Sequence, residues 1–337
     1  MVRPRTDVSR GLAFALTSAL TFALSGPFAR ALMDAGWTPT AAVIARLAGG
    51  AVALAAVATV VRPQWLAEAR RHARTVVLYG LIPIAGAQLC YYNAVAHLSV
   101  GVALLLEYTA PILVVGWVWA TTRRRPSVMT FGGVAVAIAG IILVLDVFSG
   151  AHINLIGVSW GLAAAVCAAC YFMMSNKAST DGDGLNPISL AAGGLIIGTT
   201  AVALLGVAGI MPLTFTTNPV TIAGHTTAWL VPVIALGLIP TALAYTLGII
   251  GIARLKPRFA SLVGLSEVLF AVLIAWIMLG EAMSVSQAIG GAVVLVGLAV
   301  ARQGDRSEQA SPREATQIER ATWPDMALQE TSERAND

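Results

Sequence analysis

Apolar residues in this chain of 337 residues come in long stretches that are separated by short polar segments. Ten of these stretches have about the 20 residues that an α-helix needs to cross the hydrocarbon core of a bilayer. The pattern therefore predicts an all-α polytopic membrane protein with ten transmembrane helices. The predicted spans are residues 11–33, 39–61, 74–95, 99–121, 128–148, 156–177, 187–209, 226–250, 258–280 and 283–301.

The composition agrees with this pattern, because 57% of the residues are hydrophobic and only 11% are charged. Soluble domains carry about 25% charged residues. The first apolar stretch is too long for the core of a cleaved signal peptide and is predicted to stay in the protein. From Arg302 onward the chain is polar and rich in Glu, Ser, Gln and Thr, which predicts a disordered cytoplasmic tail.

The basic residues predict the orientation of these spans. If the N-terminus is cytoplasmic, all 21 Lys and Arg residues except Arg30 and Arg46 fall in cytoplasmic segments. Short cytoplasmic loops of membrane proteins carry an excess of Lys and Arg. The distribution therefore predicts a multi-pass protein of the cell (inner or plasma) membrane with both termini in the cytoplasm.

The chain also contains an internal repeat. The sequence GLIP occurs at 80–83 and 237–240, and the same offset carries Gly133 onto Gly290 and Gly140 onto Gly297. Each half has an odd number of spans, so the second copy enters the membrane from the opposite side. Inverted repeats are typical of secondary transporters. The predicted regions are a cytoplasmic N-terminus (1–10), two five-helix repeats (11–152 and 153–301) and the tail (302–337).

Proline and glycine positions suggest different roles for different spans. Pro83 and Pro240 occupy equivalent interior positions, where each removes a backbone hydrogen bond and kinks its helix. The two glycines in the last span of each half are seven residues apart and share one helix face, which favours close packing of a rigid scaffold. The alternative is that Gly and Pro are simply common in membrane helices.

Two charged residues are predicted to lie at the same depth in neighbouring spans. Arg46 and Glu107 are each about seven or eight residues from the outer end of their spans. A guanidinium and a carboxylate at one level can form a bidentate pair that offsets much of the cost of burial. The pair is predicted either as a structural clamp or as part of a site for a zwitterionic or charged substrate.

Span three ends with QLCYYNAVAH, which brings Gln88, Tyr91, Tyr92 and Asn93 together. Residues 88 and 92 are one helical turn apart and share a face. These four residues and Tyr245 complete the candidate substrate-binding set, because polar and aromatic groups that converge in a pocket suit an amphipathic solute. For the two tyrosines, an aromatic belt at the membrane surface is an equal alternative.

Glu267 is a second candidate, for proton coupling. It lies near the middle of span nine, with no basic residue in a span at its depth. Carboxyl groups in such positions serve as proton relays in transporters. The alternative is a protonated structural group that is hydrogen-bonded to Tyr245 or Ser266.

Three motifs stand out in the span region: Arg46 in span two, EYTAP at 107–111 and LGE at 279–281. With these motifs, the whole span region resembles the EamA family of the drug/metabolite transporter superfamily. Residues 237–267 are similar to the threonine/homoserine exporter branch. One departure concerns the position after Glu267, where many members of the family have Pro and this chain has Val268. The family's kink at that position is therefore expected to be missing.

The leading prediction is a secondary active transporter that exports amino acids or similar small metabolites or drugs by alternating access, with proton coupling. The alternative is a membrane-embedded enzyme that acts on lipid-type substrates. No HExxH, GxSxG or phosphate-binding loop is present to support catalysis or ATP-driven transport. The expected partners are a small-molecule solute and the lipid bilayer, with no nucleic acid, cofactor or metal; the sequence does not decide the oligomeric state.

Overall fold

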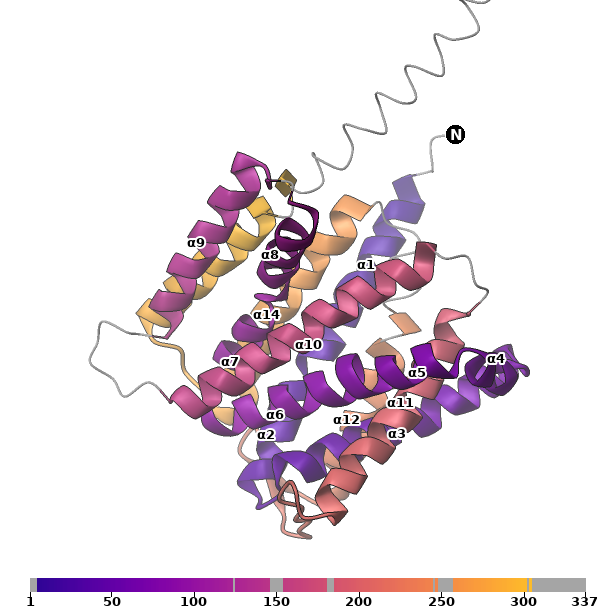
Figure 1. Ribbon diagram of the computed structural model, residues 1–337. Helices are drawn as coiled ribbons and strands as arrows, with labels where there is room; N and C mark the ends of the chain where they lie inside the picture. The colour runs from indigo at the N-terminus through magenta and orange to yellow at the C-terminus, as the bar shows by residue number, and fades with distance from the viewer. Residues whose placement is uncertain are drawn as a thin grey trace, which may run out of the picture.

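Helices form most of the described part of the chain in the computed structural model (Figure 1). The described residues are 5–123, 125–145, 154–180, 185–244, 246–247, 257–301 and 303–304. The first half contains α1 (Arg5–Ala23), α2 (Ser25–Asp34), α3 (Pro39–Val61), α4 (Trp65–Arg71), α5 (Ala73–Tyr79), the π-helical η1 (Gly80–Gly86), α6 (Ala87–His97), α7 (Val100–Glu107), α8 (Ala110–Thr122) and α9 (Val128–Val144). The second half contains α10 (Leu155–Thr180), α11 (Pro187–Val207), β1 (Val220–Ile222), β2 (His225–Thr227), α12 (Leu230–Gly237), the π-helical η3 (Leu238–Leu243), α14 (Pro257–Leu279) and a last helix over Val285–Ala301.

Several of these helices begin where the sequence supplies a capping side chain. Thr38 accepts a hydrogen bond from the N–H of Ala41, and Pro39 follows it at the first turn of α3. Asn186 and Pro187 repeat this arrangement at the start of α11. A capping oxygen satisfies one of the free N–H groups of the first turn, and proline fits there because its missing N–H is not needed.

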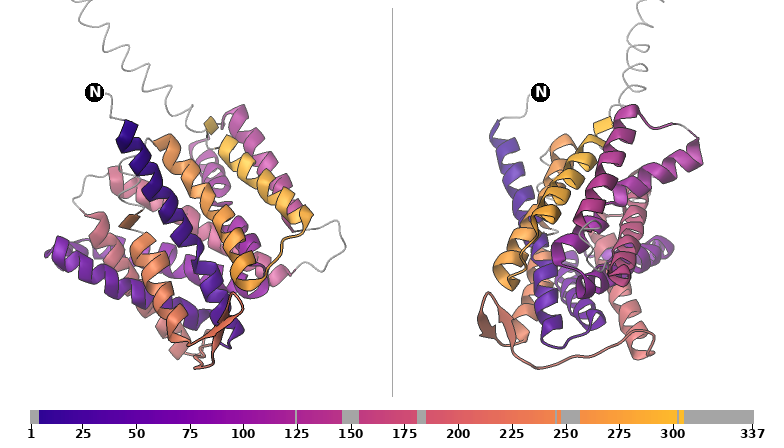
Figure 2. Two further views of the ribbon diagram at one scale, coloured as in Figure 1. Left: turned by 180° about the vertical axis from the view of Figure 1, so that it is seen from behind. Right: turned by 90° about the vertical axis from the view of Figure 1, so that its left-hand side faces the viewer.

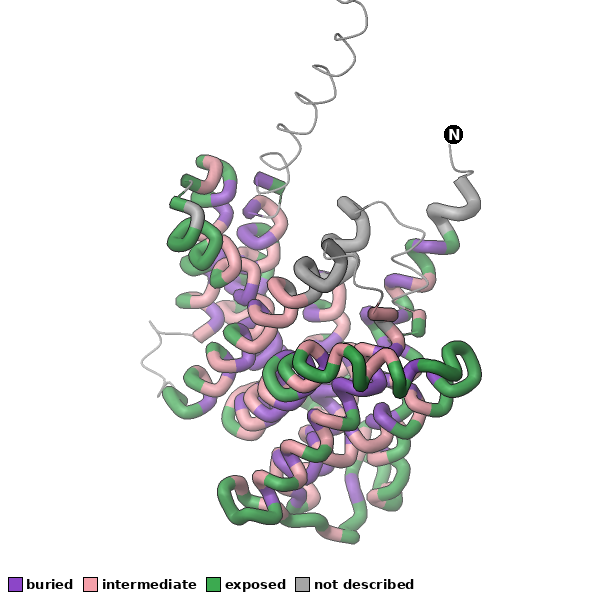
Figure 3. Tube along the Cα trace, turned by 45° about the vertical axis from the view of Figure 1, so that its right-hand side comes forward, coloured by how far each residue is buried: buried purple, intermediate pink, exposed green. Residues whose placement is uncertain are grey.

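Five helical runs in the described part of the chain are long and apolar enough to cross a membrane, and five more apolar helices are shorter. Each predicted span overlaps one of these ten segments. Many large apolar side chains on the outer sides of the helices are exposed, as the distribution of exposed positions in Figure 3 suggests. Val52 and Leu204, for example, are 73% and 63% exposed. The molecule is therefore a helical integral membrane protein whose apolar surface suits lipid.

Close glycine contacts confirm the packing predicted for the last span of each half and agree with the internal repeat. A Cβ atom on Gly133 would lie 2.6 Å from the carbonyl oxygen of Gly297, and one on Gly140 would lie 2.8 Å from that of Gly290. The repeat offset carries Gly133 onto Gly290 and Gly140 onto Gly297, so the two glycine pairs are equivalent in the repeat. Helix α9 and the last helix therefore pack against each other through the same surface, as an inverted repeat requires; Figures 1 and 2 show them side by side.

The two copies of GLIP also adopt the same unusual backbone. Pro83 lies inside η1 and Pro240 inside η3, so both prolines interrupt regular α-helix at equivalent positions. Proline has no N–H to donate to the carbonyl four residues earlier. In the second copy, the hydroxyl of Thr241 donates instead to that carbonyl, on Leu236, at 3.3 Å. The predicted local disruption by the prolines is confirmed.

One predicted span boundary is wrong. Residues 226 and 227 were expected in span eight, but they belong to β2, which pairs antiparallel with β1, and α12 begins only at Leu230. Ala223 and Gly224 connect the strands with φ values of 51° and 76°, which is the backbone that a two-residue type I′ hairpin requires. The hairpin is a small exception to the all-α prediction. It lies at the opposite end of the bundle from the start of α1 (Figure 2).

Candidate functional site

Two membrane-length segments contain a local interruption of the regular α-helix, at which the backbone of Leu24, Tyr108 and Thr109 stays in the right-handed helical region. The first segment changes from α1 to α2 at Leu24, so Ser25 begins the new helix. The fourth segment is interrupted between Glu107, which ends α7, and Ala110, which begins α8. Thr109 in this break donates its hydroxyl to the carbonyl of Leu106 at 2.6 Å. Irregular backbone at membrane depth is tolerated only where protein buries it or a cavity adjoins it, and such breaks form the binding sites of many transporters.

Arg46 lies on α3 beside the first break and is only 5% exposed. Its Nη1 donates to the hydroxyl of Ser25, to Oε1 of Gln88 at 2.5 Å and to the hydroxyl of Tyr92 at 3.4 Å. The hydroxyl groups of Ser25 and Tyr92 are 3.0 Å apart. The guanidinium carbon also lies 5.8 Å from the centre of the Tyr92 ring, within the range of a cation–π interaction. Neutral oxygen atoms from two helices, α2 and α6, thus surround one buried cation on α3.

The predicted ion pair between Arg46 and Glu107 is not formed. Both residues are described, and the ion pairs between described residues are Arg30–Asp34 and Arg62–Glu68. Arg46 has an electrostatic influence on Glu107, but the hydrogen bonds of its Nη1 go to oxygen atoms from α2 and α6. The prediction failed because equal depth does not place two side chains on facing sides of their helices.

Glu267 has a hydrogen-bond partner that the sequence did not suggest. Its Oε2 accepts a hydrogen bond of 2.7 Å from the hydroxyl of Tyr108, which lies in the break of the fourth segment. Tyr245, one of the two expected partners, lies outside the described residues. Arg46 has an electrostatic influence on Glu267 as well as on Glu107, so the three ionisable groups belong to one cluster.

The remaining residues of span three divide into two groups. Tyr91 and Tyr92 are 4% and 0% exposed, with ring centres 5.7 Å apart, which favours the binding set over the lipid-facing belt. Gln88 and Tyr92 both bond to Arg46, as expected for two residues on one helix face. Asn93 instead donates its amide to the carbonyl of Leu89 in the same helix at 2.7 Å.

Ser25 and Tyr108 are the two residues of the cluster that sequence reasoning missed. Each stands next to a feature that was visible in the sequence: Ser25 precedes Gly26-Pro27, and Tyr108 is the second residue of EYTAP. The available signal was the helix break itself, because side chains at a break can face inward from positions that a regular helix would direct elsewhere.

Helix α14 has no corresponding break. It runs continuously over Pro257–Leu279, through Val268, so the kink that was expected to be missing is indeed missing. The next motif, LGE, has a structural contact: a side-chain oxygen of Glu281 accepts the N–H of Val100 at 3.0 Å. This bond attaches the segment after α14 to the start of α7 and so helps to fix the two helices that carry Glu267 and Glu107.

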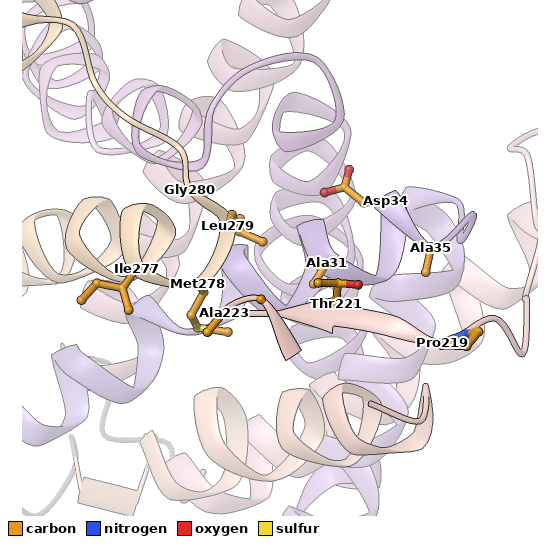
Figure 4. Close-up of a pocket in the computed structure, with 11 residues that line it drawn as sticks. Ala31, Asp34, Ala35, Pro219, Thr221, Ala223, Ile277, Met278, Leu279 and Gly280 are labelled. Carbon is orange, nitrogen blue, oxygen red and sulfur yellow. The ribbon is translucent and has the colours of Figure 1, made fainter. Parts of the chain in front are cut away.

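A cavity of about 510 Å³ lies between the end of α2, the β1–β2 hairpin and the end of α14 (Figure 4). Asp34 at the end of α2, Thr221 of the hairpin and Met278 of α14 contribute to its wall. The N–H of Ala223 donates to the carbonyl of Met278 at 2.8 Å, so the hairpin is attached to α14. Ser25 lies nine residues before Asp34 on α2, or about 13 Å along a helix. The cavity and the charged cluster therefore lie at different depths along α2 and α14.

Comparison with known proteins gives the class to which this fold and site belong. The EamA-like transporter family matches residues 9–146 and again residues 155–302. The chain belongs to this family and is a membrane transporter.

Individual relatives are more distant. The threonine/homoserine exporter RhtA of Escherichia coli (strain K12) is 28% identical over 244 residues, which cover 70% of this chain and 74% of that protein. An uncharacterized transporter of Archaeoglobus fulgidus is 26% identical over 211 residues, covering 63% of this chain and 70% of its own. A solved crystal structure, 20% identical, superposes with a TM-score of 0.60 and covers 88% of this chain and 97% of that one, which supports the fold alone.

Proposed function

We propose that the protein is a secondary active transporter of the cell membrane that exports amino acids or similar small metabolites by alternating access. Ten transmembrane helices in two inverted repeats, with both termini in the cytoplasm, form the transport unit. The observation that carries the proposal is the meeting of two broken helices at one buried polar cluster, Arg46 with Ser25, Gln88 and Tyr92. Discontinuous helices at buried polar groups are how transporters of other folds build their substrate sites.

The chemistry of the cluster suits a zwitterionic solute. A guanidinium group binds a carboxylate with charge-assisted hydrogen bonds, and a carboxylate binds an ammonium group. Arg46 supplies the first group and Glu107, at the other break, supplies the second; the hydroxyl and ring of Tyr92 complete the surface. The relatives named as threonine/homoserine exporters carry amino acids of this charge type, which supports the same substrate class here.

Glu267 is the proposed coupling group. It is held by Tyr108 of the opposite repeat, so a change in its protonation acts directly on the break in the fourth segment. When Glu267 takes up a proton from outside, its carboxyl group becomes a weaker acceptor for the Tyr108 hydroxyl, which would favour one of the two openings of the transport cavity. When Glu267 releases the proton to the cytoplasm, the other opening would be favoured. Such a two-state element, biased by both proton and solute, is what coupling requires.

Flux measurements in proteoliposomes test this function. Vesicles with an acid interior should accumulate external labelled threonine or homoserine when they contain the protein, because protons leave as solute enters. A protonophore should abolish the accumulation, and vesicles with an Arg46→Gln protein serve as the control. If no amino acid in a broad panel moves faster than with the Arg46→Gln protein, the proposed substrate class is wrong.

A further inference from the structure

The short helix α4 forms a defined surface at the edge of the bundle (Figure 1). Trp65, its first residue, is 5% exposed, and its ring N–H donates to the hydroxyl of Thr59 at 3.1 Å. The backbone N–H of Trp65 also donates to the carbonyl of Arg62 at 2.9 Å. These contacts fix α4 against the end of α3, so the side chains on its other sides point outward in a set arrangement.

Glu68 is the only acidic residue of α4, and its side chain is directed toward α11. Glu68 accepts a hydrogen bond of 2.7 Å from the hydroxyl of Ser189, near the start of α11. This bond, with Arg62 and the N–H of Asn186, lowers the pKa of Glu68 below its usual value even though some desolvation opposes the shift. Glu68 is thus ionised and engaged with α11 and with Arg62, from which it lies 3.5 Å.

The outward surface of α4 is consequently basic. Arg70, Arg71 and Arg74 are exposed. Among the described residues the ion pairs are Arg30–Asp34 and Arg62–Glu68, so no carboxylate neutralises these three arginines at ion-pair distance. Guanidinium groups bind phosphate oxygens bidentately, which makes such a group of arginines suitable for phosphate esters.

Apolar side chains adjoin these charges. Val60 and Val61, at the end of α3, are 82% and 59% exposed, and Leu66 on α4 is 50% exposed. Leu66 and Arg70 are one turn apart and share a face of the helix. An apolar surface that changes directly into guanidinium groups at the end of a membrane helix matches the boundary between acyl chains and headgroups.

We propose that α4 with Arg70, Arg71 and Arg74 is a binding site for the phosphate headgroups of anionic phospholipids in the cytoplasmic leaflet. The proposal uses the orientation given above but not the transport activity. The lipid acyl chains cover Val60, Val61 and Leu66 while the arginines hold the phosphate. Because Glu68 joins α4 to α11, a lipid bound here also supports the cytoplasmic ends of α3 and α11.

Native mass spectrometry of the purified full-length protein in detergent tests the site. Phosphatidylglycerol should be retained in preference to phosphatidylcholine, and Arg70→Gln/Arg71→Gln should lose at least half of the retained phosphatidylglycerol. The matched control is Arg123→Gln/Arg125→Gln, which removes two exposed charges from another predicted cytoplasmic loop and should keep the preference. Equal retention by the α4 variant and the wild type would overturn the proposal, and so would an equal loss in both variants.

Thermal unfolding of the wild-type protein gives a test that needs no variant. Phosphatidylglycerol should raise the unfolding midpoint by a few degrees, whereas phosphatidylcholine or free glycerol phosphate should not. At 1 M salt the Debye length is about 3 Å, and the advantage of phosphatidylglycerol should disappear. The proposal is wrong if glycerol phosphate stabilises as well as the lipid or if the advantage persists at 1 M salt.

Discussion

The fourth segment of the first repeat and its counterpart α14 in the second repeat differ at equivalent positions. The fourth segment breaks between α7 and α8, close to Pro111, and Glu107 and Tyr108 lie at the break. In α14 the position equivalent to Pro111 is Val268, and the helix continues through it with Glu267 on an uninterrupted backbone. In the same register Glu107 corresponds to Gly264 and Glu267 to Ala110, so each segment carries an acid at a position where the other has none, and only the fourth segment is interrupted.

This difference shows where the symmetry of the fold ends. The glycine contacts between α9 and the last helix and the two π-helical segments are repeated in both halves. By contrast, Arg46, Gln88, Tyr92 and Tyr108 come from the first half, and Glu267 comes from the second. We infer that the symmetric parts are scaffold and that transport chemistry lies in the asymmetric polar cluster.

The largest effect is expected from the buried cation of the first half. Arg46→Gln removes the charge that Ser25, Gln88 and Tyr92 surround; each hydrogen bond to a charged group contributes about 1.5–3 kcal/mol. Transport should fall by more than about tenfold, since 1.4 kcal/mol corresponds to tenfold. Arg30→Gln is the control, because Arg30 lies outside the cluster: it forms a partly exposed ion pair with Asp34, a kind of pair that contributes about 0–1 kcal/mol, and donates to the carbonyl of Val95. Similar losses in the two variants would contradict a special role for Arg46.

A scaffold glycine should affect stability rather than chemistry. Gly133→Ala places a Cβ atom 2.6 Å from the carbonyl oxygen of Gly297, and overpacking of this kind costs about 1–3 kcal/mol. Gly132→Ala is the adjacent control, because its Cβ atom would have no neighbour within 4 Å. The unfolding midpoint in detergent should fall only for Gly133→Ala, while the solute affinity of the folded fraction stays unchanged. A selective loss of affinity would place the last spans in the site.

Removing the hydrogen bond between Tyr108 and Glu267, which joins the two halves, should have a moderate effect on transport. Tyr108→Phe removes the donor to Glu267, and a typical hydrogen bond contributes about 0.5–1.5 kcal/mol. We expect proton-driven accumulation to fall several-fold, while exchange of solute without a gradient changes little. If accumulation and exchange fall together, Tyr108 acts in solute binding and not between the break and Glu267.

The smallest effect is expected from Asn93. Its amide bonds only to the Leu89 carbonyl among the described contacts, so Asn93→Ala should change transport and stability little, within about 0.5 kcal/mol. Gln88→Ala, five residues earlier, removes a partner of Arg46 and should reduce solute affinity clearly. Equal solute affinities of the two variants in a binding assay would contradict the view that Gln88 belongs to the Arg46 cluster and Asn93 does not.

The sequence predicted the repeat and its rigid contacts because these depend on residue type and spacing. Glycines seven residues apart share a face, and a proline disrupts its helix wherever the helix packs. The partners of Arg46 and Glu267 could not be predicted in this way, since depth along a helix does not give the direction of a side chain around it.

The hairpin shows a different limit. Thr226 and Thr227 continue an apolar stretch, and length alone assigned them to a span. The positive φ angles at Ala223 and Gly224 end the preceding strand and direct the chain into β2 instead. Only the glycine in this turn was a visible signal, and a single glycine inside or beside an apolar stretch is compatible with a helix as well.

The most direct test of the central claim, that Glu267 couples protons to solute movement, is accumulation measured against exchange in proteoliposomes. Glu267→Gln keeps the size of the side chain and an oxygen atom for Tyr108 but cannot change its protonation. The variant should exchange labelled for unlabelled amino acid across the membrane yet fail to accumulate it under a proton gradient. Glu281→Gln, whose oxygen can still accept the N–H of Val100, is the matched control and should accumulate normally. Proton-driven accumulation by Glu267→Gln at the wild-type level would contradict the claim.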